Sequence, residues 1–558
     1  MSRHATPLLV ALLTVPTVAQ TPPASPIQPC VPPNGKCFTG GSTSPNYDRI
    51  RYFEYFLAAQ KDSAECSVRV ENGRIVFAAP VTNGAMTCPD AFSWKLYTES
   101  IGQEFWKNWA SDDQTWPAAP HSPCIGTVSD TCCDLTSLIQ NAAHCPLFPG
   151  ALPSAATTPL RLGVPPSKPH IPGMVPSSEL PLLLKRAGET DPDRMIRQSM
   201  TEVVFRNRPM LAYVRRNRLY STDGLADVFA RNSANVGTSD SNSGAPYHLV
   251  SREGSLASIE FPSDAVMIKS DWVIAKYAKD LYGITEDPAF PFIKMYIRTA
   301  SDPRNPNKTE PSECWLLGFH VSSKDIPNWV WTTFEHVNNR GRCDFIGCSD
   351  SFGYSSADQT CPGQANNYTA AHTTCDNLAN PSWIYDLGKS YPSGPISPSL
   401  DAIFEALNIG NGPPPPPGAQ TPSPRDPGWR SYRLKGSQTD FTDPTGRRTL
   451  LGNSITEAGF VLTSSCISCH ARAGVNANGQ SPLGVFVNEV NEQGYLQSVS
   501  GIPQPDWYNA TRQPPLLQTL QADFVWGILA ASPEVKPGAL LEAVPPTRKT
   551  PRDIIRPD

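Results

Sequence analysis

The stretch Cys466-Ile467-Ser468-Cys469-His470 decides how the rest of the chain is interpreted. On a helix, Cys466 and Cys469 are i, i+3 neighbours and Cys466 and His470 are i, i+4 neighbours, so two thiols and one imidazole share a face. This C-x-x-C-H pattern is the attachment signature of c-type haem. The two thiols add to the porphyrin vinyl groups, and the histidine becomes the proximal iron ligand. We therefore expect one covalent haem c at this motif, with Cys466, Cys469 and His470 binding the cofactor.

Two other kinds of site also use paired cysteines. A thioredoxin-like C-x-x-C needs a strand, a turn and a helix, and it has no need of the histidine. A structural zinc site needs a second pair of ligands nearby, and residues 471–558 contain neither Cys nor His. The chain has 15 Cys and 9 His in 558 residues, so an accidental C-x-x-C-H is rare. These considerations favour haem over both alternatives.

The N-terminus predicts export. Arg3 and His4 precede an apolar stretch, residues 7–18, which has the length of a signal-peptide core. Small residues before position 20 offer a cleavage site, and the stretch is too short to span a bilayer. We interpret residues 1–19 as a signal peptide, expect no transmembrane segment in the mature chain, and expect a periplasmic or otherwise exported location.

The other cysteines fit an oxidising compartment. Thirteen remain when the motif pair is set aside (15 − 2 = 13), and eight of them can close four disulfides whose connectivity the sequence does not choose. The remaining five leave one that is either free or paired with the early group. The early group is Cys30, Cys37, Cys66, Cys88, Cys124, Cys132, Cys133 and Cys145, and the middle group is Cys314, Cys343, Cys348, Cys361 and Cys375.

Length makes two domains the default expectation, and a helical pattern followed by strand patterns along the chain predicts an α+β fold. The net charge of −5, from 46 basic and 51 acidic residues, leaves no basic surface for nucleic acid. We expect a disulfide-rich N-terminal region, followed by a β-sheet core with a C-terminal haem-bearing helix. The predicted divisions are the signal peptide (1–19), a Pro-rich arm (20–45), a Cys-rich N-terminal domain (46–145), a Pro-rich linker (146–182), a helical segment (183–248), a haem c domain (249–532) with insertions at 338–380 and 410–428, and a tail (533–558).

The haem c domain should begin with strands. Alternating apolar residues predict strands at Ser258–Phe261, Ala265–Lys269, Phe292–Thr299, Trp315–Val321 and Trp329–Val337. Further on, Ser454-Ile455-Thr456-Glu457 has the pattern of a capping box and predicts a helix from about Ile455. Gly474 can end that helix, which would place the haem cysteines in its last turns.

The iron's second axial position has no ligand in the C-terminal segment, because residues 471–558 contain neither Met nor His. A protein ligand must come from upstream, or the iron is five-coordinate or takes water or a small molecule. His320 and His336 are the main candidates, each as a distal ligand, a pocket acid/base or a hydrogen-bonded structural histidine. Met267 and Lys269 are weaker candidates, and Met267 is expected in the core.

Strand alternation separates His336 from its neighbour Glu335. It places His336 with Val330 and Phe334, and Glu335 with Trp331, so only one of the two can face the haem. Burying a carboxylate is costly unless it is paired, whereas a neutral imidazole with one bonded nitrogen is not. We therefore expect His336 to be the one that faces the haem.

The layout resembles that of cytochrome c′-beta and its lysine-crosslinked, hydroxylamine-oxidising relatives. Besides C-x-x-C-H, the segments 261–269, Trp329-Val330-Trp331 and 522–526 carry the resemblance, which covers about residues 249–530. It implies a β-sheet core with the haem lodged against it, His470 as the proximal ligand and an open distal face. The family's crosslinking lysine is not assigned to any residue here. The Trp-x-Trp-x-x-Phe-Glu-His text with a late motif also resembles large bacterial cytochrome c family proteins with a single C-x-x-C-H, which implies no substrate.

Three functions remain open. The first is a periplasmic electron-transfer cytochrome with a redox partner protein, which the covalent haem favours. The second is a haem enzyme, such as an oxidoreductase, or a gas-ligand binder with an open iron. The missing downstream ligand, the His336 and Glu335 pair and the length of the chain favour this second function. The third is a haem-bearing binding or sensor module, which only the cysteine-rich N-terminal region suggests.

Overall fold

The computed structural model describes residues 62–63, 65–138, 144–148, 200–236, 255–280, 284–300, 309–339, 342, 348, 350–353, 396–416, 419, 421–442, 446, 448–457, 464–483, 486–490, 496–498, 501–510 and 516–535. The predicted signal peptide and the Pro-rich arm lie outside these ranges, as do Cys30 and Cys37. Most of the predicted linker, of the 338–380 insertion and of the C-terminal tail also lie outside them.

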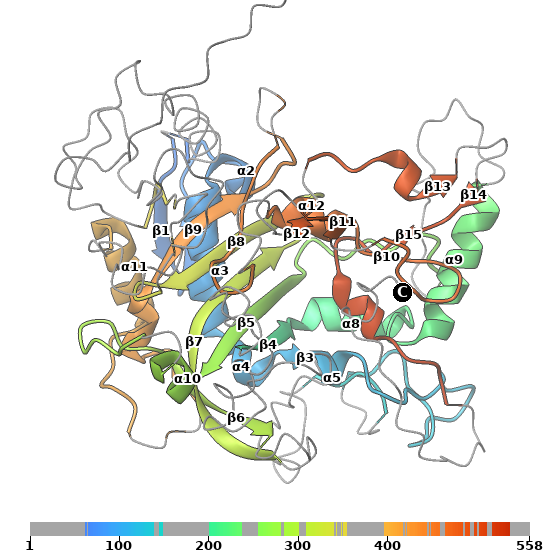
Figure 1. Ribbon diagram of the computed structural model, residues 1–558, viewed down its shortest axis with the longest axis horizontal. Coiled ribbons are helices and arrows are strands. Elements are labelled where there is room, and N and C mark those ends of the chain that lie inside the picture. Colours follow the sequence, from blue (N-terminus) through green and yellow to red (C-terminus); the bar gives the residue numbers. More distant parts are fainter. Residues whose placement is uncertain are drawn as a thin grey trace, which may run out of the picture.

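A seven-stranded antiparallel sheet forms the centre of the fold (Figure 1). Its strand order is β3-β4-β5-β7-β8-β9, and β6 also pairs with β7. The strands are β3 (Ala110–Ser111), β4 (Met200–Arg206), β5 (Val266–Ile274), β6 (Lys294–Ala300), β7 (Thr309–Ser323), β8 (Val330–His336) and β9 (Tyr432–Gln438). Four of the predicted strands are therefore confirmed, as β5, β6, β7 and β8.

Helices and short strands surround this sheet. The helices are α2 (Gly84–Thr87), α3 (Pro89–Gly102), α4 (Phe105–Asn108), α5 (Asp112–Thr115), α8 (Arg208–Arg216), α9 (Thr222–Val236), α10 (Ala275–Asp280), α11 (Pro398–Leu407) and α12 (Cys466–Ala471), with 3-10 turns η5 (Pro427–Ser431), η7 (Pro505–Trp507) and η8 (Trp526–Ala530). The short strands are β1 (Val68–Glu71), β2 (Arg74–Phe77), β10 (Gly474–Val475), β11 (Phe486–Val490), β12 (Leu496–Ser498), β13 (Asn509–Ala510), β14 (Leu516–Leu517) and β15 (Leu520–Gln521). Together they confirm an α+β fold.

Two local predictions are wrong. Residues 258–261 form no strand, and Phe261 is instead fixed as irregular backbone by the hydrogen bond from its N–H to Asp523 Oδ2 (2.7 Å). The predicted helical segment 183–248 contains α8 and α9, but Met200–Arg206 is strand β4. Its β-branched residues Thr201, Val203 and Val204 suit a pleated strand between two neighbours better than a helix.

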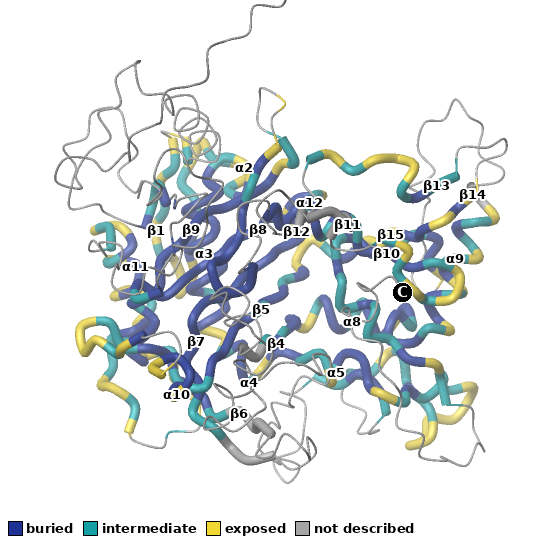
Figure 2. Tube along the Cα trace, in the orientation of Figure 1, coloured by how far each residue is buried: buried dark blue, intermediate teal, exposed yellow. Residues whose placement is uncertain are grey.

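One face of the sheet packs against the N-terminal helices. Trp94 and Tyr97 of α3 are fully buried, and their rings meet Phe334 of β8 at centroid distances of 5.0 and 4.8 Å. Tyr97 also donates its hydroxyl to the carbonyl of Trp429. The cysteine-rich region and the sheet therefore share one hydrophobic core, seen as the dark-blue centre of Figure 2.

The other face of the sheet packs against α8, α9 and the C-terminal segments. Met267 and Trp331 of the sheet belong to this second core together with Ile467 of α12, Val475 of β10 and Leu520 of β15. Met267 is buried there, as predicted. This face, which we call the motif face, places the C-x-x-C-H helix against the sheet.

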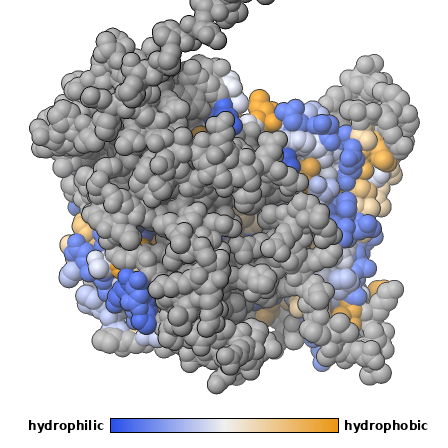
Figure 3. Space-filling model, in the orientation of Figure 1, coloured by the Kyte–Doolittle hydropathy of each residue, from blue (hydrophilic) through white to orange (hydrophobic). Residues whose placement is uncertain are grey.

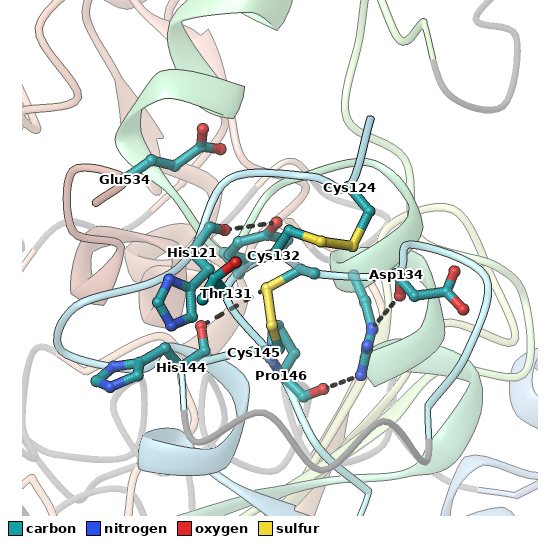
Figure 4. Close-up of a disulfide and its surroundings, with 12 residues drawn as sticks. His121, Cys124, Thr131, Cys132, Asp134, His144, Cys145, Pro146 and Glu534 are labelled. Atoms are coloured by element: carbon teal, nitrogen blue, oxygen red, sulfur yellow. Dashed lines mark hydrogen bonds between the residues drawn. A yellow bond between two sulfur atoms is a disulfide. The ribbon is translucent and has the colours of Figure 1, made fainter. Parts of the chain in front are cut away.

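Disulfides fasten the region before residue 146. The described pairs are Cys66–Cys88, Cys124–Cys132 and Cys133–Cys145, and the last two lie side by side in Figure 4. Beside them the buried Arg215 donates to the carbonyls of Asp134 (2.8 Å) and Pro146 (2.5 Å). These bonds attach the disulfide-rich loop to α8, which carries Arg215.

The described surface is mixed in character. Where the face drawn in Figure 3 is coloured, it shows both hydrophilic and hydrophobic areas. Within the described ranges we find no helix with the length and apolar character needed to cross a membrane.

Candidate functional site

The C-x-x-C-H motif forms its own short helix, α12, beside β8 (Figure 1). Ser465 precedes it with extended backbone (φ −145°, ψ 105°) and bridges to Leu451. Gln438, at the end of β9, accepts a hydrogen bond from the N–H of Ile467 (3.0 Å) and donates to Ser465 Oγ (3.0 Å). The motif is therefore positioned by the last residue of β9, the edge strand of the central sheet.

The predicted helix from Ile455 through the motif is wrong. Residues 454–457 form a single turn, and Ser465 is extended, so the cysteines lie at the start of α12 rather than in the last turns of a longer helix. Asn453 is the residue that caps this turn, because its Oδ1 accepts from the N–H groups of Ile455 (2.8 Å) and Thr456 (3.4 Å). Gly474 does not end the helix but lies in β10, where an added Cβ would be 2.8 Å from the carbonyl of Leu520.

His470 is held in the state that a metal ligand requires. Its Nδ1 lies 2.8 Å from the carbonyl oxygen of Phe524, and a carbonyl can only accept, so Nδ1 carries the proton and Nε2 keeps its lone pair. Burial, assisted by the charge of Lys269, lowers the pKa of His470 to about 3, so the ring is neutral at neutral pH. Its ring lies 4.4 Å from that of Trp331, centroid to centroid.

Both cysteines of the motif are buried beside this imidazole. Cys466 is 9% exposed and Cys469 is 7% exposed, and both are thiols rather than members of a disulfide. Burial raises the pKa of the Cys466 thiol, and its Sγ donates to the carbonyl of Leu451 (3.4 Å). Trp526 of η8 donates its Nε1–H to the carbonyl of Cys469 (3.2 Å), so the C-terminal segment closes over the helix.

Five ionisable side chains gather on the motif face of the sheet. The strand register pairs Lys269 with His320 and Asp271 with Glu202, and Glu457 reaches the same place from the 454–457 turn. We call Glu202, Lys269, Asp271, His320 and Glu457 the sheet-face cluster. Lys269 Nζ lies 3.4 Å from Glu202 Oε2, His320 Nε2 lies 3.4 Å from Glu457 Oε2, and the hydroxyl of Thr456 donates to Asp271 Oδ2.

The environment perturbs the protonation of these groups strongly. Burial, with the neighbouring Glu202 carboxylate, raises the pKa of Asp271 to about 7. Burial also opposes ionisation of Glu457, but His320 and Lys269 outweigh it and lower the pKa of Glu457 to about 2. Burial alone would lower the pKa of Lys269, yet Glu202 and Glu457 raise it above its ordinary value. Groups with raised pKa values and groups with lowered ones in the same place are typical of functional sites.

The cluster and the motif adjoin each other. The charges of Lys269, His320 and Glu457 all act on the pKa of His470, and those of Lys269 and Glu457 also act on that of Cys466. The structure therefore brings together the predicted ligands of the motif and two of the predicted upstream candidates, His320 and Lys269.

His336 lies elsewhere. It is fully buried on the opposite face, where its ring stacks on Phe292 at 3.6 Å and its Nδ1 accepts from the N–H of Asn338 (3.1 Å). Burial lowers the pKa of His336 to about 3. The expectation that His336 faces the motif is therefore not met. Alternation along β8 places Glu335, and not His336, on the face of Trp331, which contacts His470.

Glu335 is buried on the motif face because it is paired. Its carboxylate lies 3.3 Å from Lys435 Nζ and accepts from the N–H (2.8 Å) and the hydroxyl of Ser454. The register of β9 shifts by one residue at Lys435, a β-bulge between Gly436 and Leu434, where this pair forms. Glu335 therefore fastens the 454–457 turn, which carries Glu457, to the sheet.

Sequence reasoning missed Asp271, Glu202, Glu457 and Gly318 as parts of this site. Lys269 and Asp271 are two residues apart on a strand and so share a face, which was the available signal. Gly318 has no side chain where Asn453 approaches: an added Cβ would be 2.6 Å from Asn453 Nδ2. Nothing local in the sequence indicates that Glu457 meets His320, because the two belong to distant segments.

Comparisons with known proteins add no family to these observations. Among the described residues, no group of three or more His, Cys, Asp and Glu side chains is arranged to hold a metal ion by itself. No model of a protein family, no curated protein and no solved structure matches the chain. The resemblance to haem proteins therefore remains a prediction from the motif and its surrounding segments.

Proposed function

We propose that this chain is an exported c-type cytochrome that carries one covalent haem and serves a redox function, with electron transfer as its first role. Cys466 and Cys469 would hold the porphyrin through two thioether bonds, and His470 Nε2 would ligate the iron. The observation that carries the proposal is the hydrogen bond between His470 Nδ1 and the Phe524 carbonyl, which leaves Nε2 free of a proton beside two buried thiols. The bound group supplies one-electron chemistry.

The donor set fits such a group. Two thiols and a neutral imidazole share one face of α12 at i, i+3 and i+4. The disulfides at Cys66–Cys88, Cys124–Cys132 and Cys133–Cys145 fit the oxidising compartment in which haem c is attached. A periplasmic or otherwise exported location is part of this proposal.

A haem enzyme or ligand-binding protein with an open iron is the second candidate. The sheet-face cluster favours it, because an electron carrier needs no buried groups that take up and release protons, whereas an enzyme that activates a small molecule does. Asp271, with a pKa raised to about 7 by burial, and the paired His320 and Glu457 would supply that acid–base chemistry.

Covalent attachment is tested by intact-mass measurement of protein exported together with a haem-maturation system. The mature chain should gain the mass of one haem, and acid-acetone should not extract it. Cys466→Ala combined with Cys469→Ala should abolish the gain, whereas Cys314→Ser, which changes a buried cysteine of β7 outside the motif, should keep it. A wild-type chain without the added mass, or a double variant that keeps it, would refute the proposal.

The ferric spectrum of the same preparation separates the two roles. A low-spin spectrum means six-coordinate iron and supports electron transfer. A high-spin spectrum means an open axial position and supports the enzyme or ligand-binding role.

A further inference from the structure

The sheet-face cluster contains more acidic than basic groups. Lys269 pairs with Glu202 and His320 pairs with Glu457, each at 3.4 Å, so even with both bases protonated the described residues offer no further cation to the third carboxylate, that of Asp271. The cluster therefore carries an uncompensated negative charge unless Asp271 holds a proton. In a buried setting such a charge is costly and is sensitive to any positive charge nearby.

Asp271 is placed to take up that proton. Its side chain is fully buried, Oδ2 accepts from the Thr456 hydroxyl, and Oδ1 accepts no hydrogen bond from any described residue. The charged groups that act on it are Glu202 from β4, Lys269 from its own strand and His320 from β7, and His320 is itself paired with Glu457 of the 454–457 turn. Glu335, one strand further on the same face, is already neutralised by Lys435.

Asp271 and the motif share electrostatic neighbours. Lys269 and His320 act on the pKa of Asp271 and on that of His470. A change of charge at the motif is therefore felt by the groups that set the protonation of Asp271. Oxidised haem iron carries one more positive charge than reduced iron, so oxidation stabilises the carboxylate and reduction stabilises the carboxylic acid.

We propose that Asp271 takes up one proton from solvent for each electron that arrives at the haem held by Cys466, Cys469 and His470, and releases it on oxidation. The inference rests on the proposed function and deepens it, since it makes the site a proton-coupled redox centre. Charge and atoms balance: a one-electron redox partner supplies the electron, the Asp271 carboxylate becomes a carboxylic acid, and the net charge of the buried site stays constant.

The test is the midpoint potential measured by spectroelectrochemical titration from about pH 5.5 to about pH 8.5. In the wild type the potential should fall as pH rises through neutrality, with a slope approaching about 59 mV per pH unit, the equivalent of a tenfold change in a one-electron equilibrium. Asp271→Asn should make the potential independent of pH. Asp350→Asn is the matched control, because burial also raises the pKa of Asp350 to about 7 but it lies on the opposite face, bonded to Trp94 Nε1 (2.9 Å). This control should keep the slope.

A second variant covers the case in which Asp271→Asn does not fold. Thr456→Val keeps the carboxylate but removes the hydroxyl that stabilises its ionised form, so the pH at which the potential begins to fall should move upward. A wild type that carries haem but has a pH-independent potential would overturn the inference and leave the proposed function intact. An unchanged slope in Asp271→Asn would overturn it too. So would a Thr456→Val variant whose potential begins to fall at the same pH as that of the wild type. Absence of covalent haem from the wild type overturns the proposed function, and the inference with it, before any potential is measured.

Discussion

His320 lies on the motif face of the sheet, whereas His336, on the neighbouring strand, lies on the other face. His320 contacts Glu457, whose charge acts on His470, so its imidazole is the partner of a carboxylate near the proposed haem site. Removing it in His320→Ala should leave that carboxylate without its imidazole partner, stabilise the oxidised state of the proposed haem and lower its midpoint potential. The measurement is the potential at about pH 7.

His336→Ala is the comparison. It should leave the potential unchanged, but it should lower the free energy of unfolding by about 2–4 kcal/mol, because a buried ring stacked on Phe292 is lost. Urea denaturation measures this cost. The assignment fails if His336→Ala shifts the potential as much as His320→Ala does.

Glu335 and His336 show why the sequence located only part of the site. Alternation correctly separated Glu335 from His336, but the choice between them used the cost of burying a carboxylate. In the structure Lys435 offsets that cost, because a bulge in β9 brings its Nζ to 3.3 Å from the Glu335 carboxylate. A residue's own neighbours in sequence do not reveal such a partner.

The 454–457 turn is the element that connects the motif segment to the sheet. Glu335 binds it through Ser454, and both Glu335 and Lys435 are fully buried. Glu335→Gln would leave the Lys435 ammonium buried without its carboxylate, so it should lower the free energy of unfolding by about 3–5 kcal/mol. Replacing Lys435 by Met in the same variant should recover most of the loss. Chemical denaturation of the single and double variants measures both.

The exposed i, i+4 pair of Lys276 and Asp280 gives the matched control. Both side chains are about half exposed, so Asp280→Asn should cost less than about 1 kcal/mol. A Glu335→Gln cost equally small would show that the buried pair does not fasten the turn.

At this scale the strands were predictable and the point where the motif helix begins was not. β7 and β8 alternate over enough residues for period-2 patterning to dominate. The Ser454-to-Glu457 text does have capping geometry, but Asn453 caps a single turn and Glu457 Oε2 accepts from its N–H at 2.5 Å. The tertiary contact of Glu457 with His320 holds this turn against the sheet, and nothing in the sequence of residues 454–457 indicates that contact.

Across the whole molecule, buried carboxyls set how stability responds to pH. Three aspartates meet where α3 begins: Asp62 accepts from the N–H of Asp90, and Asp90 and Asp350 hold the segment from Ser351 to Gly353. Burial and the neighbouring Asp90 raise the pKa of Asp62 to about 8 and that of Asp350 to about 7. The folded protein thus retains protons that the unfolded chain has lost.

Stability should therefore fall as pH rises from about 6.5 to about 8. A carboxyl whose folded pKa is raised contributes stability at low pH and loses it as pH passes through the folded value. For Asp350 this amounts to roughly 1 kcal/mol over the interval. Buried His336, with a lowered pKa, acts mainly as pH falls below about 6.5, outside most of this interval.

Urea unfolding at several pH values tests this expectation. Asp350→Asn cannot ionise and should flatten the dependence by roughly 1 kcal/mol. Asp134→Asn should not, because hydrogen bonds from Thr136 lower the pKa of Asp134 and keep its titration out of the interval. Equal slopes in Asp350→Asn and the wild type would contradict the assignment.

The closure of the C-terminal segment over α12 imposes an order on biosynthesis. Once Trp526 and Tyr508 have bonded to the carbonyls of Cys469 and Ala471, both thiols are less than a tenth exposed and out of reach of a maturation enzyme. A haem attached at this motif, as proposed, must therefore be attached before the residues downstream of the motif dock. Slow docking of those residues would favour haem attachment, whereas rapid docking would bury the two thiols before any haem is attached.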